Sequence, residues 1–103
     1  MNWNIACIQM DIAFGQPEMN YKVAEQLISQ AVQSNPDVIV LPELWTTGYD
    51  LTRLDEIADL EARNTIAFLQ TIAKKYHVHL VGGSIAKKTL EGIYNTMLMI
   101  NNK

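Results

Sequence analysis

The stretch Val38–Asp50 reads VIVLPELWTTGYD and places a carboxylate directly after an apolar run. The four residues Val38–Leu41 are typical of a strand that is buried on both faces of a sheet. Pro42 has no amide hydrogen, so it ends ladder pairing where it stands and favours an extended conformation in Leu41. Glu43 is therefore expected at the exit of the strand, where a charge is costly unless the site uses it.

Two interpretations of Glu43 follow from its position alone. Open α/β sheets bind ligands beyond the carboxyl ends of their strands, and a partly buried carboxylate there is suited to act as a general base. Alternatively, Glu43 stabilises the positive end of a nearby helix or pairs with a surface lysine. The position does not decide between them.

Composition limits the classes of function. The chain has 103 residues, 49% of them hydrophobic and 18% charged, which predicts one globular domain with a single core. A net charge of −3 argues against binding to nucleic acid or to an anionic membrane, because both require clustered Lys and Arg. We expect a cytoplasmic protein, since the sequence shows no secretory leader, no membrane-spanning apolar run and a single cysteine, Cys7.

The apolar periodicity changes several times along the chain and predicts an α/β fold. A first strand in 3–10 precedes a helix that begins near Pro17 and ends before Pro36, and the second strand is Val38–Leu41. A second helix is expected over about 62–76. The stretch HVHLVGGS predicts a third strand that ends in Gly82–Gly83, and GIYNTMLMI predicts a fourth, joined to the third by a turn around Lys87, Lys88 and Gly92.

The same stretches carry a family resemblance. Val38–Tyr49 resembles the signature around the catalytic glutamate of the nitrilase superfamily, the carbon-nitrogen hydrolases. The opening NIACIQMD, at 4–11, resembles the first strand of that family, Val81–Ile85 the third and Tyr94–Ile100 the fourth, in family order. The resemblance implies that residues 1–103 are the N-terminal portion, incomplete by itself, of a four-layer α-β-β-α sandwich.

The resemblance also implies a chemistry. Such enzymes hydrolyse amides or nitriles through a thioester with a Glu, Lys and Cys triad, without a cofactor or metal, and complete members usually form homodimers. By this resemblance, Glu43 would be the general base. Its place in the loop after Glu43 gives Tyr49 two readings that the sequence leaves open: its ring lines the substrate pocket, or it is an exposed loop residue that packs on its neighbours. The triad Lys and Cys are not present in this chain. The start at Met1 looks most like the small amidases that act on ω-amides of short dicarboxylic acids, so a small-molecule amide is the expected partner.

Other polar residues are interpreted as structural. Cys7 is expected in the core of the first strand, and His77 and His79 would face one side of the third strand without a third metal ligand. Trp45 either lines the pocket or packs on its own loop. Four lysines are interpreted as solvated charges, two on the second helix and two in the turn between the last strands: Lys74, Lys75, Lys87 and Lys88. Lys103 is not interpreted as the catalytic lysine either.

Two functional hypotheses remain. The first is an amide hydrolase of which this chain supplies only the base, so that the 103 residues alone would be inactive. The second is a truncated, catalytically inactive module that acts by pairing with another subunit through an exposed sheet edge.

Overall fold

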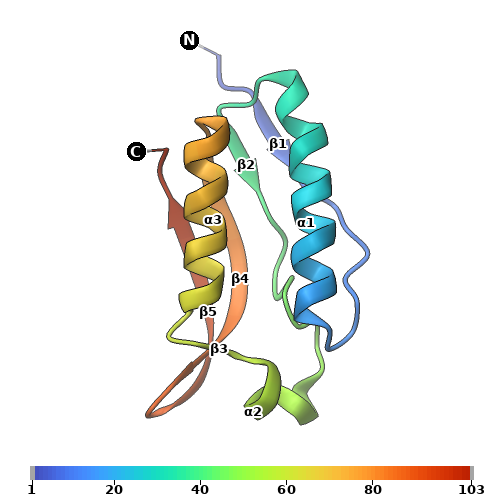
Figure 1. The fold of residues 1–103 in the computed structure, drawn as a ribbon, viewed down its shortest axis with the longest axis vertical. Helices are drawn as coiled ribbons and strands as arrows, with labels where there is room; N and C mark the ends of the chain where they lie inside the picture. The colour runs from blue at the N-terminus through green and yellow to red at the C-terminus, as the bar shows by residue number, and fades with distance from the viewer. Residues whose placement is uncertain (1, 103) are drawn as a thin grey trace.

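The computed structural model describes residues 2–102, which form a five-stranded sheet with two long helices on one face (Figure 1). The parallel strands β1, β2 and β4 lie side by side in that order. Strand β3 pairs in parallel with the far end of β4, and β5 pairs with β4 in antiparallel fashion. The strands span Ile5–Cys7 (β1), Val38–Val40 (β2), Asp59–Leu60 (β3), His79–Thr89 (β4) and Gly92–Ile100 (β5).

Helices connect the parallel strands, as the periodicity predicts. Helix α1 spans Pro17–Ala31 and continues into the 3-10 helix η1, Val32–Ser34, whereas α3 spans Arg63–Tyr76. Between β2 and β3 lie two short turns of helix, η2 at Leu51–Arg53 and α2 at Leu54–Ile57. Pro17 stands in the first turn of α1, where its missing N–H breaks no helical hydrogen bond.

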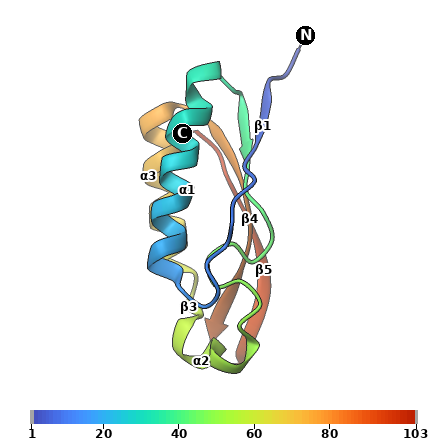
Figure 2. The same cartoon turned by 90° about the vertical axis from the view of Figure 1, so that its right-hand side faces the viewer.

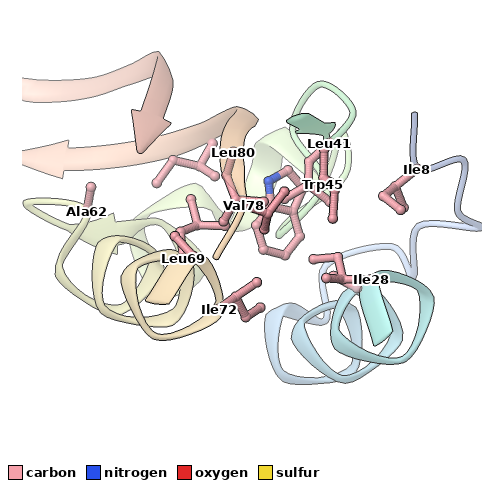
Figure 3. Close-up of a cluster of buried hydrophobic side chains, with 13 residues drawn as sticks. Ile8, Ile28, Leu41, Trp45, Ala62, Leu69, Ile72, Val78 and Leu80 are labelled. Atoms are coloured by element: carbon pink, nitrogen blue, oxygen red, sulfur yellow. The ribbon is translucent and has the colours of Figure 1, made fainter. Parts of the chain in front are cut away.

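The hydrophobic core lies between the helices and the side of the sheet that faces them (Figure 3). Its largest fully buried side chain, Trp45, belongs to the loop after β2. The Trp45 ring meets the Tyr21 ring edge-on, with centroids 5.4 Å apart, and its indole N–H donates to the Gly82 carbonyl at 2.7 Å. The loop that carries Glu43 is thus anchored in the core, and Trp45 packs there and does not line a pocket.

The other face of the sheet carries no helix in the part of the chain that the structure describes (Figure 2). Met97 and Met99 are 65% and 72% exposed there, and Ile5 of β1 is also exposed. Cys7 is exposed as well, so its expected place in the core is wrong. Side chains alternate along a strand: Ala6 packs against the core, and its neighbours Ile5 and Cys7 point the other way.

Strand β4 is longer than the sequence predicts. It does not end at Gly82–Gly83 but passes through them with a bulge between Val81 and Ser84 and continues to Thr89. Pairing with β5 on one edge and β3 on the other sustains the extended conformation. The hairpin itself is confirmed, but Lys87 and Lys88 belong to β4 and not to the turn.

Asn20 of α1 ties together two loops that are far apart in the sequence. Its side chain is fully buried and accepts the Ala13 N–H at 2.7 Å. Its amide N–H groups donate to the carbonyls of Ala13 at 2.8 Å and Thr46 at 2.9 Å. The loop before α1 and the loop after β2 are therefore held by one side chain.

We predict that Asn20→Ala lowers the free energy of unfolding by about 3 kcal/mol, because three backbone groups lose their partner in a buried place. Urea unfolding followed by circular dichroism measures the change. Gln26→Ala, on the exposed side of the same helix, is the control and should stay within about 0.5 kcal/mol of the unmodified chain. Equal stability of the two variants would contradict the role given to Asn20.

Candidate active site

Glu43 lies just beyond the carboxyl end of β2. The parallel ladder continues one residue past the strand, where the Leu41 N–H donates to the Val81 carbonyl at 2.9 Å, and Pro42 then ends it. The Glu43 side chain is exposed, so the partial burial expected from the sequence is wrong for this chain. The reason is that the described residues cover only one face of the sheet.

The bulge in β4 holds the backbone on both sides of Glu43. The Ser84 N–H donates to the Pro42 carbonyl at 3.3 Å, and the Ser84 hydroxyl accepts the Leu44 N–H at 3.0 Å. Leu44 has a φ of 47°, a left-handed conformation that costs energy for a residue with a Cβ atom. Gly83 also has a positive φ, and a Cβ atom there would collide with the Pro42 carbonyl oxygen.

Each oxygen of the Glu43 carboxylate faces one donor. The Tyr49 hydroxyl donates to Oε1 at 2.7 Å, and the Asn95 side-chain amide donates to Oε2 at 3.4 Å. The hydrogen bond to Glu43 is the main reason why the pKa of the Tyr49 phenol is raised, because an ionised phenol can no longer donate. Tyr49 comes from the same loop as Glu43, whereas Asn95 comes from β5.

Glu43 borders a cavity of about 350 Å³ that opens on the uncovered side of the sheet. The other lining residues are Gly83, Ser84, Asn95 and Met97. A volume of this size lies at the lower end of the range for small-molecule sites. A carboxylate that keeps lone pairs free at the edge of such a cavity can take a proton from a neighbouring group.

Comparison with known proteins identifies the family. Residues 4–103 match the carbon-nitrogen hydrolase family. The chain belongs to this family. It is 47% identical over 103 residues to 2-oxoglutaramate amidase of Bacillus subtilis, covering all of this chain and 39% of that enzyme. Omega-amidase NIT2-A of Xenopus laevis is 31% identical over 77 residues, which are 75% of this chain and 28% of that protein.

The fold expected from the resemblance is also confirmed. Nit3 of Saccharomyces cerevisiae, a member of branch 10 of the nitrilase superfamily, superposes with a TM-score of 0.85 at 24% identity. The match covers 95% of this chain and 39% of Nit3. The chain thus spans about two fifths of the length of such relatives, and its sheet with one helical layer is consistent with the N-terminal part of an α-β-β-α fold.

The structure of this carbon-nitrogen hydrolase chain brings together Glu43 and Tyr49, two site residues that the sequence predicts. It also places Ser84 and Asn95 at the site, which the sequence does not predict. Alternation along the predicted last strand places Asn95 on the same face as Met97, but nothing local indicates that this face meets Glu43. The signal for Ser84 is weaker, because its contacts depend on the bulge in β4.

The histidines and the cysteine lie outside the candidate site. His77 ends α3 in a left-handed conformation and His79 begins β4, so the expectation that both face one side of a strand is wrong. Among the described residues, no group of three or more His, Cys, Asp or Glu side chains could hold a metal ion.

Within residues 2–102, no helix has the length and apolar character needed to cross a membrane.

The lysines are confirmed only in part as solvated charges. Lys74 and Lys75 are exposed on α3, as expected. Lys87 and Lys88 are partly buried in β4, and the Lys88 ammonium donates to the Asp55 carbonyl at 3.1 Å, so their assignment to a solvated turn is wrong. Lys103 lies outside the described residues.

We predict that Glu43→Gln lowers the pKa of the Tyr49 phenol back toward its usual value of about 10. Because the pKa of the Tyr49 phenol is raised, its hydroxyl keeps its proton and its hydrogen bond to Glu43 at neutral pH. This hydrogen bond is lost only as the pH rises through the pKa of the phenol. NMR titration of the Tyr49 ring carbon that bears the hydroxyl measures the shift. Glu91→Gln, at the exposed tip of the β4–β5 hairpin, is the control variant and should leave the Tyr49 titration unchanged. A Tyr49 titration that Glu43→Gln does not change would contradict the contact.

Proposed function

We propose that residues 1–103 are the N-terminal portion of a carbon-nitrogen hydrolase domain, and that the complete protein hydrolyses a small amide with Glu43 as general base. The observation that carries this proposal is the place of the Glu43 carboxylate: at the carboxyl end of a parallel strand, beside a cavity, and held by two donors. Family membership supports the reaction class.

The proposed reaction has two stages and follows the family resemblance. Glu43 takes the proton of a cysteine thiol supplied by a later part of the protein, and the sulfur attacks the amide carbonyl. The C–N bond breaks, the proton passes to the leaving nitrogen, and ammonia and a thioester result. Glu43 then takes a proton from water, which attacks the thioester, releases the carboxylic acid and restores the thiol. A lysine would stabilise the oxyanion in both stages, so no cofactor or metal is required.

The substrate we propose is an ω-amide of a short dicarboxylic acid. This choice rests on relatives with the names 2-oxoglutaramate amidase and omega-amidase. Tyr49 contacts Glu43 through its hydroxyl and is 58% exposed, and we propose that its ring forms part of the wall that meets this substrate. We further propose that the complete protein is a cytoplasmic homodimer, and that the 103 residues alone are inactive because the nucleophile is absent from them.

We expect Glu43→Gln in the complete protein to lower kcat for 2-oxoglutaramate by about 1,000-fold, since Gln keeps the shape but cannot take a proton. Ammonia release measures the rate. Glu91→Gln, at the exposed tip of the β4–β5 hairpin, is the matched control and should keep the full rate. An unchanged rate in Glu43→Gln, with an unchanged melting temperature in both variants, would exclude Glu43 as the base.

A second candidate is the inactive pairing module, and the uncovered apolar face of the sheet is the observation that favours it. Met97, Met99 and Ile5 present apolar surface there that a second subunit could cover. Size-exclusion chromatography of the 103-residue chain at high concentration tests this candidate. A peak at twice the monomer mass would support it, and elution only as a monomer would count against it.

A further inference from the structure

We propose that Tyr49 and Asn95 are positioning residues, which hold the Glu43 carboxylate in the orientation that proton transfer requires. This inference rests on the proposed function of Glu43 as the base. It assigns a role to Asn95 that the sequence does not indicate, and it adds to the pocket role of the Tyr49 ring a separate role for its hydroxyl.

The Glu43 side chain needs restraint to act as a base. Its side chain is exposed, has three rotatable bonds, and is free in the described chain of any ion pair with Lys or Arg. The backbone at this point is fixed by Ser84, which bonds on either side of Glu43, but that contact leaves the carboxylate free to rotate. A base contributes fully only when its oxygen stays within hydrogen-bond reach of the proton it takes.

The two oxygens of the Glu43 carboxylate each accept a hydrogen bond from a different donor. Tyr49 reaches Oε1 from the loop and Asn95 reaches Oε2 from β5, so the carboxylate is held from two different elements of the fold. One bond to each oxygen stops rotation of the carboxylate plane. Because a carboxylate oxygen can accept two hydrogen bonds, each oxygen still has a free site for an incoming proton.

The Tyr49 and Asn95 side chains contribute little to the packing of the fold. Tyr49 is 58% exposed and Asn95 is also exposed, and an exposed hydrogen bond adds little to folding because water replaces it. The side chains that anchor this loop in the fold are different ones, Trp45 and Thr47, both fully buried. Tyr49 and Asn95 thus share their contact with Glu43, and Asn95 also lines the cavity.

The distances rank the two contacts. The Tyr49 bond, at 2.7 Å, is short and assisted by the carboxylate charge, whereas the Asn95 bond, at 3.4 Å, is long. Loss of the Tyr49 hydroxyl is therefore expected to reduce the rate about 10-fold, and loss of the Asn95 amide about threefold. Tyr49→Phe keeps the ring, so it removes the bond without removing the pocket wall.

The experiment is a double-mutant cycle in the complete protein, with kcat for 2-oxoglutaramate measured by ammonia release. Tyr49→Phe and Asn95→Ala are each made with Glu43 present and with Glu43→Gln. A positioning residue acts through Glu43, so each change should lower kcat when Glu43 is present and have almost no effect in the Glu43→Gln protein. Asn95→Asp, which is isosteric but sets a second negative charge against Oε2, should lower kcat more than Asn95→Ala.

Two controls and two readouts separate positioning from folding. Tyr94→Phe removes a hydroxyl of similar exposure, and Asn64→Ala removes an exposed amide in the first turn of α3, so both should keep the full kcat. KM should change less than kcat in the Tyr49 and Asn95 variants, because these two side chains orient the base and do not bind the substrate through the groups that are removed. Melting temperatures show that every variant is folded.

The outcomes distinguish this inference from the proposed function. Losses that occur when Glu43 is present and vanish in the Glu43→Gln protein support the positioning role. Equal losses in both backgrounds, or no loss with Glu43 present, overturn the positioning role and leave Glu43 as the base. A full rate in Glu43→Gln alone overturns both the proposed function and the role inferred from it.

Discussion

The contact between the loop after β2 and the bulge of β4 is the constraint on which the candidate site depends. Four hydrogen bonds join the two segments: Leu41 to Val81, Trp45 to Gly82, and two between Ser84 and the residues that flank Glu43. Gly83 lets the backbones approach because a Cβ atom would collide with the loop. A straight β4 could not make the same set of contacts, so the bulge gives Glu43 its place.

The one-sided sheet links the stability of the chain to its function. Helices α1 and α3 bury the inner face, while Met97 and Met99 remain exposed on the outer face, and the cavity beside Glu43 opens on that same side. In a chain of 103 residues, one core between a sheet and two helices stabilises the fold only modestly. Under the proposed function, the layer that covers the outer face would also close the site and reduce the exposure of Glu43.

The order of the elements was predictable because it depends on local periodicity. The apolar stripe of α1, the apolar run of β2 and the alternation in β5 are each visible in the spacing of residues along a single element. In β2 only Ile39 is fully buried, because the outer face of the sheet is uncovered in the described residues. The end of β4 was not predictable in this way. Glycines usually weaken a strand, yet pairing with β3 and β5 carries β4 through Gly82 and Gly83.

The sequence by itself determined the family, the α/β order and the place of Glu43 at the end of β2, because these depend on a short motif and on spacing along the chain. Only the tertiary structure decided which residues surround Glu43. Asn95 lies 52 positions away in the sequence, and it reaches the carboxylate only because β5 pairs with β4. The exposure of Cys7 was decided in the same way, since a strand pattern does not tell which face of the sheet is covered.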